Sequence, residues 1–288
     1  MRPRIALFVL EALPNARTVR RFVADHAADI ALVGLSNAER PATGGLIGQV
    51  RTHLARSGRR FLPYLAVNFG LPDLMRLIAP LTQSLSGTRE AAEATPLRAL
   101  CGRLQIPTLA VDAVNGAEVA RAMAEHAPDL IITFHFDQIL SAQTLALARL
   151  GGLNVHPGLL PRHRGPVPTI HALSDGPDAF GVTIHRLAVA IDTGAILEQE
   201  AVALAPDVTA TRASVLLHEH GRRLLDKVLD AVARDGALSE GRSAPVLPYC
   251  PFPDRALLDD LHRRGLRLTD AHDLREALSL SGRGTATP

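Results

Sequence analysis

Short apolar runs alternate with helical patterns along the chain. The runs IALFVL (residues 5–10), IALVGL (30–35), DLIITF (129–134) and GGLNVHP (151–157) are separated by segments such as ARTVRRFVADHA and EVARAMAEHA, in which apolar residues recur at helical spacing. Continuous apolar strands separated by helices are typical of parallel sheets that are covered on both faces. The pattern therefore predicts an α/β fold with a doubly wound, mostly parallel sheet.

A segment of different character follows the second predicted strand. Residues 51–86 are rich in Leu, Arg and Pro, with basic residues ahead of an apolar face, and do not form a regular strand–helix unit. We expect a helical insert of one or two helices packed on the domain, because an apolar helical stripe usually marks a core contact. A membrane-surface or partner-docking element is the alternative.

The pattern changes again after Leu204. Residues 207–236 repeat leucine and valine at helical spacing and predict one long helix, and the Pro-rich remainder predicts a small irregular extension with short helical segments. His218 and His220 stand two apart on the long helix, a spacing that does not suit paired metal ligands, so we expect them at the surface. We expect residues 1–205 to form the catalytic core and residues 206–288 a C-terminal helix and extension.

Composition narrows the functional classes. A chain of 288 residues with 47% hydrophobic content can bury a large core, and a formal charge of +2 gives no electrostatic footprint for nucleic acid. Cys101 and Cys250 show neither a metal-ligand spacing nor a disulfide framework. No leader pattern and no apolar stretch long enough to span a bilayer is present, so we expect a cytoplasmic protein without integral membrane association.

The chemistry concentrates in the run LNVHPGLLPRHRG, residues 153–165. Asn154 and His156 are two apart, so on a strand they project from the same face, and Pro157 should end that strand. Ligands of such sheets bind beyond the carboxyl ends of the strands. A strand–loop–strand segment, GVTIHRLAVAIDTGAILEQEAV (181–202), then places Asp192 in its loop. Taken singly, each residue has a structural explanation: a turn cap, a hydrogen-bonded core histidine and an Asx turn.

Together these motifs match a known pattern. The ordered set N-x-H-P-x-L-L-P-x-x-R-G, then G-V-T-I-H, then I-D-T-G-x-I-L-x-Q resembles the catalytic core of the 10-formyltetrahydrofolate-dependent formyltransferases. The resemblance implies that Asn154, His156 and Asp192 are catalytic. Asn154 would donate to the oxyanion of a tetrahedral intermediate, and His156 would donate a second bond if protonated. We expect Asp192 to raise the pKa of His156 and to accept the proton of the amine, directly or through water.

The resemblance also places the folate donor. It implies that 10-formyltetrahydrofolate lies along the loop after residues 129–134 and against the loop before Asp192, with these residues at the pterin: Phe136, Gln138, Ile139, Leu140, Val189, Ala190 and Ile191. Arg162 and Arg164 either meet an anionic part of a ligand or form a solvated basic turn. His135 either lines the site or caps its strand. No metal is expected.

The acceptor is less defined. The first strand leads into FVLEALPNART without a glycine-rich phosphate turn, which disfavours a phosphorylated glycinamide. The tail of mixed charge disfavours transfer RNA, and we expect no domain ahead of the first strand of the kind that folate hydrolases carry. We therefore expect transfer to a small-molecule amine, such as an amino sugar or sugar nucleotide. A 10-formyltetrahydrofolate hydrolase and a degenerate folate- or partner-binding protein are the alternatives, and the long helix offers a surface for a homodimer.

Overall fold

The computed structural model describes residues 2–36, 45–72, 74 and 95–280. Seven strands form one sheet in the order β3-β2-β1-β4-β5-β6-β7, in which β1 to β5 are parallel and β6 and β7 run antiparallel to their neighbours. The strands are β1 (Ile5–Val9), β2 (Ile30–Ser36), β3 (Thr108–Val111), β4 (Leu130–Phe134), β5 (Gly152–His156), β6 (Gly181–Arg186) and β7 (Ile196–Ala201). The predicted doubly wound, mostly parallel sheet is confirmed, and β3 is a strand that the sequence analysis missed.

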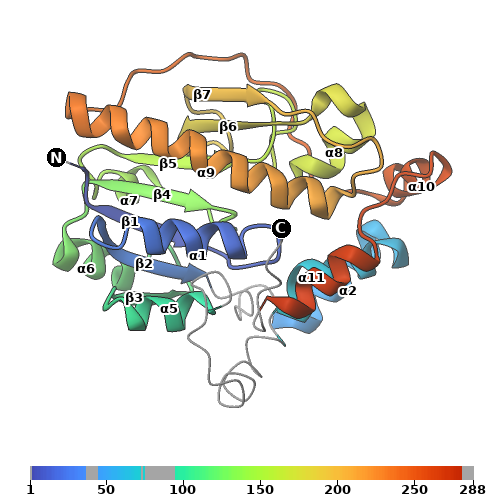
Figure 1. Ribbon diagram of the computed structural model, residues 1–288, viewed down its shortest axis with the longest axis horizontal. Helices are drawn as coiled ribbons and strands as arrows, with labels where there is room; N and C mark the ends of the chain where they lie inside the picture. The colour runs from blue at the N-terminus through green and yellow to red at the C-terminus, as the bar shows by residue number, and fades with distance from the viewer. Residues whose placement is uncertain (1, 37–44, 73, 75–94, 281–288) are drawn as a thin grey trace.

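Helices cover both faces of this sheet (Figure 1). They are α1 (Ala16–Asp25), α2 (Gly45–Ser57), α3 (Leu62–Leu65), α5 (Leu97–Arg103), α6 (Ala117–His126), α7 (Ala142–Leu145), α8 (Pro168–Asp175), α9 (Ala210–Asp235), α10 (Arg255–Arg263) and α11 (Ala271–Ser279). Alternate residues of β1 enter different clusters: Ile5, Leu7 and Val9 pack with α1 and α9, whereas Ala6 and Phe8 pack with α6. This alternation follows from the pleat of a strand that is buried on both faces.

The long helix α9 crosses the sheet over β5 and β6. Thr209 caps its first turn by accepting a hydrogen bond from the Arg212 N–H, and Gly236 ends it in the left-handed conformation. A Cβ at Gly221 would lie 2.6 Å from Val155, so this glycine permits the close approach of α9 to β5. That approach brings the first half of α9 to the carboxyl ends of β4 and β5.

The described part of the predicted insert is helical, as expected. After α2 come the short segments Arg59–Phe61, α3 and a π-helical turn over Ala66–Gly70, and residues 73 and 75–86 of the predicted insert lie outside the described ranges. Phe61 and Tyr64 belong to the main hydrophobic core, which favours the core-packing interpretation over a surface-docking element. The insert, α8, α10 and α11 lie at the same end of the sheet (Figure 1). None of the described helices has both the length and the apolar content needed to cross a bilayer.

Candidate functional site

A cavity of about 360 Å³ opens at the carboxyl ends of β4 and β5. Its walls come from the connections after β4, β5 and β6, from the insert, from α9 and from the C-terminal extension. Three of the residues that line it are Asn154, His156 and Asp192, so the side chains expected to act together do share one cavity.

Asn154 is held by partners on both neighbouring strands. It stands opposite Thr133 of β4 and opposite His185 of β6. The Thr133 hydroxyl donates to Asn154 Oδ1 at 2.7 Å, and Asn154 Nδ2 donates to His185 Nε2 at 3.1 Å. His185 Nδ1 lies 2.8 Å from the Arg186 carbonyl, to which only a protonated Nδ1 can donate. With Nε2 of His185 as the acceptor, one N–H of Asn154 is bound to this ring and the second N–H remains for a ligand.

His156 and Asp192 form a buried pair beside this amide. Nδ1 of His156 lies 3.7 Å from Asp192 Oδ2, and their side chains are 4% and 10% exposed. The Gly165 N–H donates to Asp192 Oδ2 at 2.9 Å. Asp192 has a φ of 52°, and a Cβ at Gly194 would lie 1.8 Å from the Arg186 carbonyl oxygen, so only glycine fits two residues after the acid.

Burial and charge act in opposite directions on the pKa values of His156 and Asp192. Burial alone would raise the pKa of Asp192, but His156, His185 and the Gly165 N–H outweigh it and lower this pKa to about 2. Burial lowers the pKa of His156, and the opposing effect of Asp192 is too small to reverse this. Asp192 does raise the pKa of His156, as expected, but burial lowers it by more, so the net shift is downward. At neutral pH the site holds a carboxylate and an uncharged imidazole.

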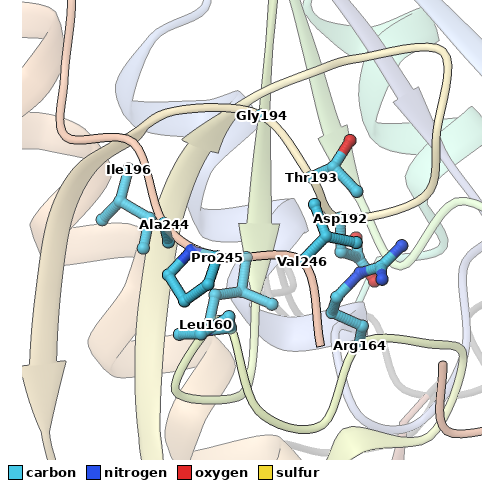
Figure 2. Close-up of a pocket in the computed structure, with 10 residues that line it drawn as sticks. Leu160, Arg164, Asp192, Thr193, Gly194, Ile196, Ala244, Pro245 and Val246 are labelled. Atoms are coloured by element: carbon cyan, nitrogen blue, oxygen red, sulfur yellow. The ribbon is translucent and has the colours of Figure 1, made fainter. Parts of the chain in front are cut away.

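Arg164 fixes the loop that carries Asp192. Its guanidinium donates to the Ile191 carbonyl through Nε at 3.1 Å and Nη2 at 2.6 Å, and to the Leu247 carbonyl through Nη1 at 2.6 Å. Figure 2 shows Ala244, Pro245 and Val246 of the extension passing beside this loop, with the Arg164 side chain next to Asp192. Arg164 thus joins the extension to the site, and its donors are engaged with backbone carbonyls rather than turned to a ligand. Arg162 is exposed and does not line the cavity.

The residues assigned to the folate donor divide into two groups. Those that line the cavity are Phe136, Gln138, Ile139, Leu140 and Ile191, whereas Val189 and Ala190 do not line it, and Val189 is 60% exposed. The Gln138 carboxamide is bound within the fold: its oxygen accepts from the Val114 N–H at 2.8 Å and its nitrogen donates to the Val111 carbonyl at 3.0 Å. Gln138 shapes this loop more than it offers polar atoms to a ligand.

Two further histidines lie close to the cavity. His135 lines it, and burial lowers the pKa of His135 to about 4. His218 of α9 lies with its ring centroid 6.0 Å from that of His135, and burial lowers the pKa of His218 to about 3. The surface position expected for His218 is wrong, because it faces the sheet across the buried side of α9. His220 is partly exposed and contacts Glu200.

Sequence reasoning missed several lining residues. His185 stands in the quoted G-V-T-I-H motif, but placing it against Asn154 requires the register of β5 and β6, which spacing does not give. Tyr64 and Phe69 of the insert and Tyr249 and Phe252 of the extension also line the cavity. They lie far from the motifs in sequence, and no local pattern distinguishes them from core aromatics.

One cluster has the composition of a metal site. Each of His156, His185 and Asp192 offers a ligand atom, and these atoms lie within 4.8 Å of one another; among the described residues this is the sole such group of three or more. Imidazole and carboxylate ligands suit a transition-metal ion. The expectation that the reaction needs no metal stays a prediction, which chelation tests.

Comparison with known proteins shows the family to which this chain belongs. The model of the family described as formyl transferase matches residues 80–229, just over half of the 288 residues. A methionyl-tRNA formyltransferase of Chlorobium chlorochromatii is 33% identical over 165 residues, which are 57% of this chain and 52% of that protein. The chain thus spans about half the length of the curated relatives it matches.

Two solved structures share the fold. A glycinamide ribonucleotide transformylase from Symbiobacterium toebii superimposes with a TM-score of 0.55 at 18% identity, covering 86% of this chain and 95% of that chain. A sugar N-formyltransferase from a Shewanella species superimposes with a TM-score of 0.51 at 18% identity, covering 98% of this chain and 89% of that chain. At these identities the likeness establishes the fold alone.

Proposed function

Because this chain belongs to the formyl transferase family, we propose that it moves a formyl group from 10-formyltetrahydrofolate to the amine of a small molecule. Asn154, His156 and Asp192 are the catalytic residues of this proposal. The observation that carries it is their convergence on one cavity from two segments that are 36 residues apart at the nearest. A protein that only binds folate has no need of this set.

The reaction requires a proton to move while an oxyanion is held. The amine nitrogen bonds to the formyl carbon, the carbonyl electrons move to oxygen, and the bond to the folate nitrogen then breaks as that nitrogen receives a proton. The N–H of Asn154 that His185 leaves available donates to the oxyanion. His156, being uncharged at neutral pH, takes the proton of the amine and can return it to the folate nitrogen.

Asp192 has an electrostatic role in this sequence of steps. Its pKa of about 2 makes it a poor base near neutrality. It remains a carboxylate 3.7 Å from the imidazole and stabilises the positive charge that His156 gains with the proton. This assignment resembles the part that a buried aspartate plays beside a catalytic histidine in other acyl-transfer sites.

The donor and acceptor sides follow from the walls of the cavity. Phe136, Ile139, Leu140 and Ile191 form an apolar wall suited to the pterin, with backbone groups supplying most polar contacts. Support for an amine acceptor comes from the similar proteins, which are named for methionyl-tRNA, glycinamide ribonucleotide and sugar substrates. A homodimer and a cytoplasmic location stay predictions, which light scattering and fractionation address.

Single substitutions distinguish the candidate activities. Asn154→Ala, His156→Asn and Asp192→Asn would be assayed for tetrahydrofolate release and for the formylated product, with small amines, with charged methionyl-tRNA and with no acceptor. His272→Asn is the control, because His272 is exposed on α11. Release without any amine would identify a hydrolase, and folate binding by the wild type without turnover would leave only a binding protein. Wild-type turnover in all three variants would overturn the assignment of the catalytic residues. Activity that is lost on chelation and restored by a metal ion would contradict the metal-free mechanism.

A further inference from the structure

The walls of the cavity outside the loops that we assign to the donor carry apolar and aromatic side chains, and we call these walls the acceptor side. Tyr64 and Phe69 come from the insert, Val167 precedes α8, and Tyr249 and Phe252 come from the extension. These elements are separate from the loops after β4 and β6 that we assign to the donor. Thr169 and Ser214 add hydroxyl groups, and both are almost fully buried. The acceptor side therefore offers apolar surface and uncharged hydrogen-bonding groups.

Positive charge is missing from the described walls. Among the described residues that line the cavity there is no lysine or arginine, and the charged ones are Asp137 and Asp192. His135 stays uncharged at neutral pH, since burial lowers its pKa to about 4. Arg164 precedes the lining residue Gly165 but does not line the cavity itself, and its guanidinium donates to two backbone carbonyls. On the described walls of the acceptor side a phosphate group would meet the Asp192 carboxylate and no lysine or arginine, whereas the ammonium form of an entering amine is attracted by Asp192.

The backbone offers little to an anion either. The N-terminus of α8 reaches the cavity through residues 166–169, and such a terminus can bind phosphate through its free N–H groups. Pro168 is the first residue of α8 and has no N–H, so one of the donors that this site would use is lacking. The side chains and this helix terminus thus disfavour the same class of ligand.

Resting on the proposed function, we infer that the acceptor amine is carried by an uncharged, largely apolar or ring-containing group rather than by a phosphorylated or nucleotide-linked sugar. The group lies between the aromatic side chains of the insert and those of the extension, with its amine toward His156 and Asp192. This narrows the sequence-based expectation, which included sugar nucleotides.

A matched pair of ligands tests the inference. Tyramine and O-phosphotyramine differ only by the phosphate, and calorimetry measures their binding to the full chain independently of turnover. We expect tyramine to bind at least about tenfold more tightly, and to be formylated with the correspondingly higher kcat/KM. Equal or tighter binding of O-phosphotyramine, or binding of neither, would overturn the inference.

Two variants separate a specific contact from a general effect. Tyr249 lines the cavity and is 45% exposed, and Leu278 of α11 is 44% exposed and does not line it. Tyr249→Ala should weaken tyramine several-fold and leave O-phosphotyramine unchanged, whereas Leu278→Ala should change neither. Equal effects of both variants would overturn the inference. If tyramine is preferred in binding but no amine is ever formylated, the proposed function fails while the ligand preference stands.

Discussion

Replacing Asp192 by Asn tests the assignment of an electrostatic role. The substitution removes the charge that lies 3.7 Å from His156 Nδ1 but keeps a side-chain oxygen that can accept from the Gly165 N–H. At that distance a unit charge pair is worth about 1 kcal/mol at an effective dielectric constant of about 80 and about 4 kcal/mol at about 20. If this energy favours the imidazolium formed in the transition state, the rate falls between about 5-fold and about 1000-fold.

The pH dependence provides a second measurement. The pKa of His156 is lowered by burial, so kcat/KM of the wild type should rise with pH through a value below 6.5 and be level at neutral pH. Without the Asp192 carboxylate this pKa falls further, and the rise moves to lower pH while the plateau drops. Asp192 itself, with a pKa of about 2, contributes no limb in the range of the assay.

A matched variant controls for the loss of any carboxylate–histidine pair. Glu200 lies 2.6 Å from His220 Nε2, and its side chain is 38% exposed. Glu200→Gln should leave both the plateau and the profile unchanged. An Asp192→Asn enzyme with a plateau within twofold of wild type, and with the same apparent pKa by rate and by histidine NMR, would refute the electrostatic role.

Three further changes have expected outcomes. Gly158→Ala places a Cβ 2.9 Å from His156 Nε2, so kcat should fall about 10- to 100-fold while the affinity for the donor is kept. Single-turnover kinetics and calorimetry measure these two quantities, and an unchanged kcat would contradict the close packing of Gly158 against His156. Arg164→Met removes the hydrogen bonds to the Ile191 and Leu247 carbonyls, and urea unfolding should show that the free energy of unfolding falls by about 2 to 3 kcal/mol. A change below about 0.5 kcal/mol would contradict a role of Arg164 in holding the loop to the extension. His218 has a folded pKa of about 3, below its unfolded value of 6.5, so the unfolded chain takes up the proton first and stability falls as the pH drops below 6.5. Between pH 8 and pH 5 that loss is about 2 kcal/mol, and His218→Leu should lose less over the same range in urea melts; an equal loss would contradict the role of His218.

Much of the frame was predictable from local pattern. The continuous apolar runs predicted β1, β2, β4 and β5, and the segment around Asp192 was correctly assigned as strand, loop and strand. The helical spacing after residue 206 predicted α9 to within three residues at its start. The strand β3 was missed because Thr108–Val111 is short and partly exposed, so its composition does not stand out from a loop.

The site residues show where sequence reasoning ends. Spacing put Asn154 and His156 on one strand face, and motif order added Asp192. The effect of Asp192 on the pKa of His156 has the expected sign, but the larger and opposite effect of burial was not predicted, because burial is the sum of contacts from several elements. The role of Arg164 was likewise not predictable, because its guanidinium donates to the Ile191 and Leu247 carbonyls, which are distant in sequence.

The sequence by itself determined the family, the sheet and the identity of the three polar side chains, because each of these depends on residues that are close together or in a fixed order. The tertiary structure alone decided that His185 contacts Asn154, that burial lowers the pKa of His156, and that aromatic residues of the insert and the extension line the cavity. Strand register, burial and the meeting of remote segments are properties of packing between elements, and no local pattern encodes them.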